Sequence, residues 1–86
     1  MKLWGKILVD SKIKKDIVVE SNSRDNYQEN LKICIMEICD KLDIEKPYWL
    51  PTNVKEYNQR GKTRFTKDNF IEEISFDKFE IEEIDN

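Results

Sequence analysis

The sequence has no histidine and no alanine, only two glycines and two cysteines, and no long apolar run. Without histidine, the chain cannot build a Ser-His-Asp or Cys-His catalytic arrangement or a histidine-containing zinc site. Gly5 and Gly61 are too far apart to form a Walker-type phosphate-binding loop. No apolar run reaches the roughly 18 residues of a membrane span, and the first residues show no signal-peptide pattern. We therefore expect a cytoplasmic protein that does not enter the membrane.

The two cysteines, Cys34 and Cys39, are five residues apart in an expected helix. This spacing rotates them by about 140° onto different faces, so they cannot form a disulfide bond with each other. Two cysteines without further ligands also do not make a zinc site. We expect reduced thiols, with Cys34 a buried apolar residue, as is typical of cytoplasmic proteins. No cofactor is expected.

Charge is what the chain has in abundance, because 38% of its residues are charged and another 38% are hydrophobic. Surface scaling for 10.4 kDa predicts that roughly 64% of the unfolded surface is buried on folding. Residues 1–86 are therefore expected to form a single domain with one core. Ile, Lys, Glu, Asp and Asn make up 48 of the 86 residues, a bias typical of AT-rich bacterial genomes.

The net charge of −3 hides a gradient along the chain. Residues 52–67 hold five basic residues and one acidic residue, whereas residues 68–86 hold eight acidic residues and one basic residue. Either these segments neutralise each other within the fold, or they form a bipolar surface that steers partners. We favour neutralisation, because adjacent segments of a small fold lie within reach of each other.

Two segments near the N-terminus alternate apolar and polar residues, which predicts strands at residues 2–9 and 13–20. A three-residue loop between them keeps both apolar sets on one face of a hairpin. This register places Ile7 opposite Lys15, and Trp4 opposite Val18 on the other face.

A polar break with Ser23 or Asp25 as the expected N-cap precedes an amphipathic helix of roughly 17 residues. Its apolar residues fall on one stripe, while Ile33 and Met36 lie off it. The stripe consists of Tyr27, Leu31, Cys34, Ile35, Ile38 and Leu42.

An irregular, aromatic-rich crossover follows, because Pro47 and Pro51 flank the Tyr-Trp-Leu triplet. Thr52 is the expected cap of a short helix to about residue 60, ended by Gly61, and Thr66 the cap of a single turn. A last strand is predicted at about residues 78–84. The predicted fold class is α+β: an N-terminal hairpin, one amphipathic helix packed on the sheet, the crossover with short helical turns, and a C-terminal strand, in the order ββαβ.

One basic and aromatic segment could hold phosphates and stack bases. The alternative, which we favour, is a solvated loop with its phenylalanine turned inward, and a pI near 5.0 also opposes general nucleic-acid affinity. The candidate binding residues are Tyr57, Arg60, Lys62, Arg64, Phe65 and Lys67.

Two further clusters have competing interpretations. Glu80 and Glu82 share a strand face at a spacing of about 6–7 Å, but a charged outer face fits them better than a metal site does. Trp4, Tyr48 and Trp49 either belong to the core or form an exposed patch for a protein partner. No catalytic residues are expected. Some pair of carboxylates always exists among 18 acidic residues, and a chain of 86 residues rarely builds a deep cleft.

The whole chain is similar to a group of short uncharacterised proteins of low-GC Firmicutes. The similarity lies in residues 2–7 (KLWGKI), 49–51 (WLP), 70–72 (FIE) and 76–81 (FDKFEI). It implies a bacterial or phage origin and a cytoplasmic location. It assigns no activity and no site residues.

The leading hypothesis is a non-catalytic protein-interaction module with no membrane partner, for which a nucleic-acid partner is disfavoured but not excluded. The alternatives are nucleic-acid binding through residues 55–67 and an acidic nucleic-acid mimic that uses residues 68–86. We expect a monomer if the last strand pairs beside the first, and a dimer through residues 3–9 otherwise. The former is favoured because it sets Lys2 and Lys6 beside acidic residues. The residues expected to be almost fully buried are Ile7, Ile17, Leu31, Ile35, Ile38 and Leu42.

Overall fold

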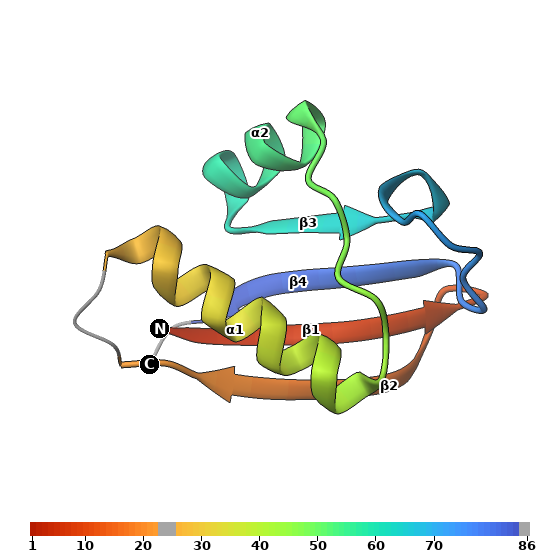
Figure 1. The fold of residues 1–86 in the computed structure, drawn as a ribbon, viewed down its shortest axis with the longest axis horizontal. Coiled ribbons are helices and arrows are strands. Elements are labelled where there is room, and N and C mark those ends of the chain that lie inside the picture. The colour runs from red at the N-terminus through yellow and green to blue at the C-terminus, as the bar shows by residue number, and fades with distance from the viewer. Residues whose placement is uncertain (23–25, 85–86) are drawn as a thin grey trace.

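The computed structural model describes residues 1–22 and 26–84. In this part of the chain, four antiparallel strands form one sheet in the order β2-β1-β4-β3, with two α-helices packed against it (Figure 1). The predicted α+β class is confirmed, with β3 as an additional strand. The elements are β1 (Lys2–Val9), β2 (Lys12–Glu20), α1 (Tyr27–Leu42), α2 (Pro51–Arg60), β3 (Lys62–Phe65), the 3₁₀ turn η1 (Lys67–Asn69) and β4 (Lys78–Ile84).

The hairpin of β1 and β2 has the predicted register up to Ile7, which lies opposite Lys15. The predicted three-residue loop is wrong. The turn has two residues, Asp10 and Ser11, with φ values of 52° and 67°. Positive φ at both positions gives a turn whose twist matches that of the flanking strands. The register shifts between Ile7 and Leu8, so a bulge takes up the odd residue that the loop was expected to hold.

Strand β4 pairs with β1 along the whole length of β4 and covers the edge that the hairpin leaves there. This is the expected arrangement, and it places Lys6 of β1 opposite Glu80 of β4. Strand β3 then adds to the outer side of β4, with Arg64 opposite Glu80. The sheet thus carries opposite charges across neighbouring strands.

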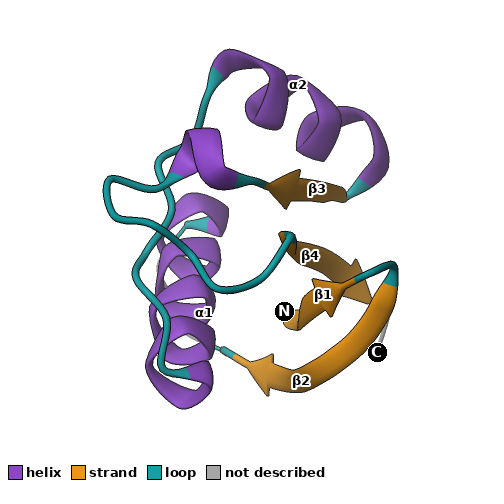
Figure 2. Cartoon of the chain, turned by 90° about the vertical axis from the view of Figure 1, so that its right-hand side faces the viewer, coloured by secondary structure: helices purple, strands orange, loops and turns teal. Residues whose placement is uncertain are grey.

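Helix α1 lies on one face of the sheet, and no element in residues 1–22 and 26–84 covers the opposite face (Figure 2). The N-cap is Asn26, whose side-chain oxygen accepts a hydrogen bond from the Glu29 N–H at 2.9 Å. The expected caps, Ser23 and Asp25, lie outside the described residues. The helix ends at Asp43, which adopts a left-handed conformation with φ of 57°.

A glycine allows α1 to approach β1 closely. A Cβ atom on Gly5 would lie 2.5 Å from Cγ2 of Ile38, a distance too short for two carbon atoms. The close approach of helix and strand at the centre of the core therefore depends on the missing side chain.

The crossover, residues 43–50, leads into α2, which is a longer helix than the short one expected. It begins at Pro51, with Leu50 as N-cap, and not after Thr52 as predicted. The Leu50 N–H donates a hydrogen bond to Oδ1 of Asn53 at 3.0 Å, so an asparagine one turn into the helix completes the cap. Gly61 ends the helix with φ of 71°, as expected.

The core lies between α1 and the sheet and extends beneath the crossover. Of the six residues expected to be almost fully buried, Ile17 and Leu31 are only partly buried. Ile17 lies on the edge strand β2, and Leu31 faces a groove described below. The buried apolar residues are Leu3, Ile7, Val19, Cys34, Ile35, Ile38, Cys39, Leu42, Tyr57, Phe65, Phe70, Phe79 and Ile81.

Candidate functional site

The aromatic members of the basic segment are buried. Tyr57 is 5% exposed and Phe65 is fully buried. The ring of Trp49 packs edge-on against both, at centroid distances of 5.7 and 5.2 Å. The interpretation with Phe65 turned inward is confirmed, although the segment is a strand and not a loop. Neither ring is available to stack on a base.

The basic members of the same segment divide into two groups. Arg64 donates a hydrogen bond from Nε to Glu80 at 2.8 Å, and Lys62 lies opposite Glu82 on the neighbouring strand. Arg60 and Lys67 are exposed. The expected neutralisation between the basic segment and the acidic C-terminal segment is confirmed at Arg64 and Glu80.

The uncovered face of the sheet carries a row of alternating charges across all four strands: Asp16, Lys6, Glu80 and Arg64. The Lys6 ammonium group lies 2.8 Å from Glu80 and 3.0 Å from Glu82, and 3.8 Å from the centroid of the Trp4 ring. Lys6 thus contacts both Glu80 and Glu82, the two carboxylates that share a strand face. Within this row each charge lies beside one of opposite sign, so the row itself presents no excess of one sign.

The pKa shifts of this row agree with its geometry. Burial disfavours the charged forms of both Lys6 and Glu80. The hydrogen bonds that Lys6 donates to Glu80 and Glu82 outweigh this effect and raise the pKa of Lys6 above 10.5. Hydrogen bonds from Lys6 and Arg64 likewise outweigh burial and lower the pKa of Glu80 below 4.5. Both groups are charged across the neutral pH range.

The thiols and carboxylates form no reactive or metal-binding cluster in the part of the chain that the structure describes. Cys34 and Cys39 are free and buried. Burial raises the pKa of Cys39 to about 11, so its thiol stays protonated at neutral pH and is a weak nucleophile. Among residues 1–22 and 26–84, no three Cys, Asp or Glu side chains come together as metal ligands.

The most site-like feature is a groove of about 670 Å³ between α1, α2 and the crossover, hereafter the helix groove. This volume lies in the range of ligand-binding pockets, which runs from about 300 to 1,000 Å³. Its lining residues are Tyr27, Gln28, Leu31, Lys32, Ile35, Met36, Lys46, Pro47, Trp49, Val54, Tyr57 and Asn58.

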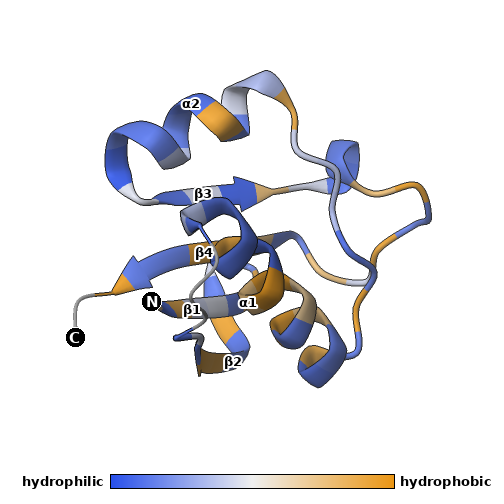
Figure 3. Ribbon diagram, turned by 60° about the vertical axis from the view of Figure 1, so that its left-hand side comes forward, coloured by the Kyte–Doolittle hydropathy of each residue, from blue (hydrophilic) through white to orange (hydrophobic). Residues whose placement is uncertain are grey.

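Apolar side chains form the walls of the helix groove and remain accessible in it. On α1, Tyr27 is 49% exposed and Met36 43% exposed, and Leu31 is partly buried between them. Val54, on the facing helix, is 46% exposed. Figure 3 shows a single hydrophobic stretch in an otherwise hydrophilic α2. The groove therefore has apolar surface on both walls.

Trp4, Tyr48 and Trp49, which the sequence assigns either to the core or to an exposed patch, have three different environments. Trp49 is partly buried and forms part of the helix groove. Tyr48 is 58% exposed. Trp4 is partly buried on the uncovered sheet face, where its Nε1 donates a hydrogen bond to Asp16 at 2.9 Å. They are neither one core cluster nor one exposed patch.

Two tyrosines that line the helix groove contact each other and a glutamate of β4. The hydroxyl of Tyr27 on α1 lies 3.0 Å from that of Tyr57 on α2 and donates a hydrogen bond to Glu83 of β4. Burial, followed by the contact between the two hydroxyls, raises the pKa of Tyr57. Burial and the bond to Glu83 raise the pKa of Tyr27. Both phenols are neutral at physiological pH, and they join both helices to the sheet.

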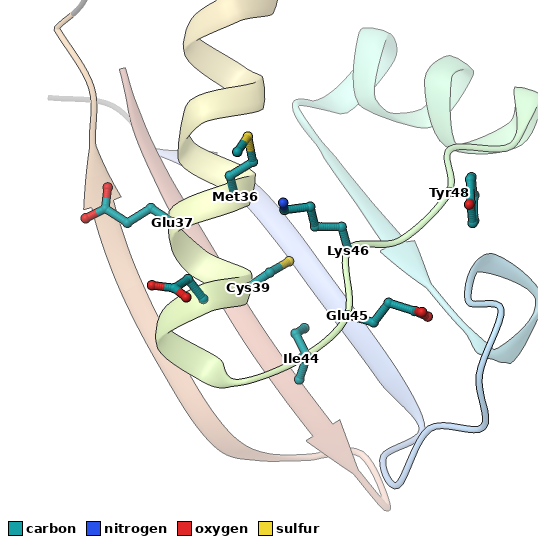
Figure 4. Close-up of a pocket in the computed structure, with 8 residues that line it drawn as sticks. Met36, Glu37, Cys39, Ile44, Glu45, Lys46 and Tyr48 are labelled. Atoms are coloured by element: carbon teal, nitrogen blue, oxygen red, sulfur yellow. The ribbon is translucent and has the colours of Figure 1, made fainter.

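The rim of the helix groove is basic. Lys32 of α1 and Lys46 of the crossover line it, and no carboxylate does. Beyond Met36 and Lys46 lies a second hollow of about 760 Å³, where Lys46 extends toward Met36 and Glu37 points away (Figure 4). The carboxylate of Glu45, which also lines this hollow, accepts hydrogen bonds from the N–H groups of Ile71 and Glu72.

A buried polar network holds α2 in place. The sequence analysis did not predict it. Asn53 is 4% exposed and donates from Nδ2 to Thr63 Oγ1 at 2.9 Å and to the Arg64 carbonyl at 2.8 Å. Its Oδ1 accepts a hydrogen bond from Asn69 Nδ2 at 2.7 Å. Asn69 in turn donates to the carbonyl of Tyr48 at 2.7 Å. The network joins α2, β3, η1 and the crossover, and so fixes one wall of the groove.

No protein-family model matches the chain, and no match was found among the curated proteins or the solved structures. Neither helix in residues 1–22 and 26–84 is long and apolar enough to cross a membrane. The geometry of the helix groove is therefore the starting point for function.

Proposed function

We propose that the protein is a non-catalytic interaction module that holds an apolar segment of another protein in the helix groove. The observation that carries this proposal is the apolar surface left accessible in the groove, which comes from Leu31 of α1, Trp49 of the crossover and Val54 of α2. A contiguous apolar surface on a small protein often marks a binding site. Tryptophan and tyrosine, which line the groove at Tyr27, Trp49 and Tyr57, are also among the residue types that dominate protein–protein binding.

The proposal places the module in the bacterial cytoplasm. Two free, buried thiols support a reducing compartment. The bias of the composition toward Ile, Lys, Glu, Asp and Asn supports a bacterial source.

Nucleic-acid binding through residues 55–67 has less support. Its two rings are buried, and Arg64 contacts Glu80. The acidic-mimic hypothesis has less support as well, because Glu80 and Glu82 contact Lys6. A gel-shift assay with DNA and RNA at low salt separates these hypotheses from ours, because nucleic-acid binding would give a shift that weakens steeply as salt rises.

Selection from a random peptide library tests the groove directly. The bait proteins are the native chain, Val54→Asp and the control Ile13→Asp. Val54 and Ile13 have nearly equal exposure, 46% and 48%, but Ile13 lies on β2 and does not line the groove. Because a carboxylate on the groove wall is costly to desolvate, peptides enriched on the native chain should bind Ile13→Asp and not Val54→Asp.

Circular dichroism and thermal melts establish that both variants are folded. The proposal is wrong if no peptide is enriched on the native chain. It is also wrong if the enriched peptides bind Val54→Asp as well as they bind the native chain.

A further inference from the structure

We propose that the segment held by the helix groove is an acidic amphipathic α-helix. This inference rests on the proposed function and adds the secondary structure and the charge of the partner. Two independent features support it: the walls of the groove and the charges on its rim.

The walls favour a helical partner over an extended one. The two facing walls belong to α1 and α2, whose backbone N–H and C=O groups are used within the helices, and the irregular crossover contributes Lys46, Pro47 and Trp49 to the lining. An extended peptide would place its own backbone groups against apolar side chains and leave them without partners. A helix satisfies its backbone internally and presents side chains alone, as in other helix-in-groove complexes.

The length of the wall also fits a helix. Tyr27, Leu31 and Ile35 follow one another at intervals of four residues along α1. They cover about 12 Å of the helix axis, since the rise is about 1.5 Å per residue. A partner helix with apolar residues at similar intervals can place about two turns against this wall, and Val54 lies on the other side of the groove.

The rim favours acidic side chains. Lys32 and Lys46 are both exposed, and neither forms an ion pair with another residue in the described part of the chain. No carboxylate lines the groove, although acidic residues outnumber basic residues by 18 to 15 in the whole sequence. The Glu83 carboxylate, which does not line the groove, accepts hydrogen bonds from the hydroxyls of Tyr27 and Tyr57. Acidic residues flanking the apolar stripe of a partner therefore meet complementary charge.

Two labelled synthetic peptides provide the test by fluorescence anisotropy. Both have the same leucine stripe with helical spacing, flanked by glutamates in one peptide and by lysines in the other. The native chain should bind the glutamate peptide about tenfold more tightly at low salt, and the ratio should shrink as salt screens the rim. The double variant Lys32→Glu/Lys46→Glu should reverse the preference.

The control variant Lys12→Glu/Lys14→Glu has the same net charge, but its changes lie on β2 away from the groove. It should keep the preference for the glutamate peptide. A third peptide, the glutamate sequence with a central proline, should lose binding because proline breaks the helix.

The outcomes separate the two proposals. If neither peptide binds, or if Val54→Asp binds both as the native chain does, the proposed function itself is wrong. If both peptides bind with equal affinity and the double variant changes nothing, the groove binds helices but the acidic partner is wrong. If the proline peptide binds as tightly as the glutamate peptide, the helical partner is wrong.

Discussion

Lys6 is almost fully buried although it lies on the uncovered face of the sheet. Its side chain is 8% exposed because Trp4 lies beside it and two carboxylates lie at its end. Replacing one member of a buried pair leaves a desolvated charge behind. Lys6→Met should therefore lower the free energy of unfolding by about 2 kcal/mol, measured by urea denaturation.

Arg64 provides the matched control, because it contacts the same Glu80 but its side chain is 58% exposed. Arg64→Met should cost less than about 1 kcal/mol, since an exposed ion pair contributes little. If Lys6→Met and Arg64→Met lose the same free energy of unfolding, burial does not decide how much each ion pair contributes.

The lowered pKa of Glu80 sets the direction of the acid response. A carboxyl group with a lower pKa in the folded state adds stability that is fully present above its unfolded pKa, near 4.5. That stability is lost as pH falls through the folded-state value. Glu80→Gln should therefore be less stable than the native chain at pH 7, and the gap should close below about pH 4.

Urea denaturation at a series of pH values measures this gap. The raised pKa of Lys6 acts at the other end, where its contribution is present below 10.5 and lost as pH rises through the higher folded-state value. A gap that stays constant down to acid pH would show that Glu80 does not titrate as the geometry requires.

Gly5 is the residue at which the core tolerates no side chain. A Cβ would lie 2.5 Å from the Ile38 side chain, so Gly5→Ala must displace α1 or strain the contact. We expect a loss of about 1–3 kcal/mol in unfolding free energy. In the background of Ile38→Ala, which removes the clashing methyl group, Gly5→Ala should cost much less. Additive losses in this double-mutant cycle would contradict the clash.

Two buried amides connect helix α2 to β3, η1 and the crossover. Asn53 uses both donors and accepts two hydrogen bonds, from Leu50 and Asn69. Asn53→Leu should cost about 3 kcal/mol, because several buried polar groups lose their partners together. Gln59→Leu, on the same helix at an exposed position that does not line the groove, should stay within about 0.5 kcal/mol. Thermal melts of both variants decide the matter, and equal melting temperatures would contradict the network.

Hydrophobic periodicity in the sequence predicted the elements that are long enough to show a regular pattern of apolar residues. The alternation in residues 2–9 and the stripe of α1 predicted the hairpin and the main helix. The pairing of β4 with β1 was favoured for a different reason, the opposite charges that it brings together. Strand β3 was missed because four residues are too short for a period-2 signal. Its identity as a strand comes from pairing with β4, which lies far along the chain.

The helix groove could not be predicted for a related reason. The apolar stripe shows which face of α1 is hydrophobic, but it does not show how completely other elements cover that face. Tyr27 and Leu31 belong to the stripe and yet line an open groove, because α2 meets α1 at the tyrosine hydroxyls and does not pack along it. The buried role of Asn53 was equally hidden, since its partners Thr63 and Asn69 are 10 and 16 residues away.

Across the whole molecule, the charges of distant segments meet on the sheet. The C-terminal segment contributes Glu80 and Glu82 to Lys6, and Glu83 to the tyrosine pair. These carboxylates are therefore engaged within the fold and do not form a free acidic array. The groove lysines Lys32 and Lys46 make no such pairs with described residues, which gives the helix groove a charge distinct from that of the sheet.

The strand order also bears on self-association. Because β4 covers β1, residues 3–9 no longer form an open edge, and the symmetric dimer considered for them loses its basis. The open edges are β2 and β3. Strand β2 carries exposed lysines, among them Lys12, Lys14 and Lys15, and β3 has only four residues. Lysines and short strands both discourage pairing between sheet edges.

We therefore expect a monomer of 10.4 kDa in sedimentation at about 100 μM protein. Trp4→Lys is the informative variant, because Trp4 lies on the uncovered face, where it contacts Lys6 and Asp16. In a monomer, this change should leave the sedimenting mass unaltered. A mass near twice the monomer value that falls to the monomer value in Trp4→Lys would contradict the expectation. It would show that the uncovered face of the sheet, rather than a strand edge, joins two copies.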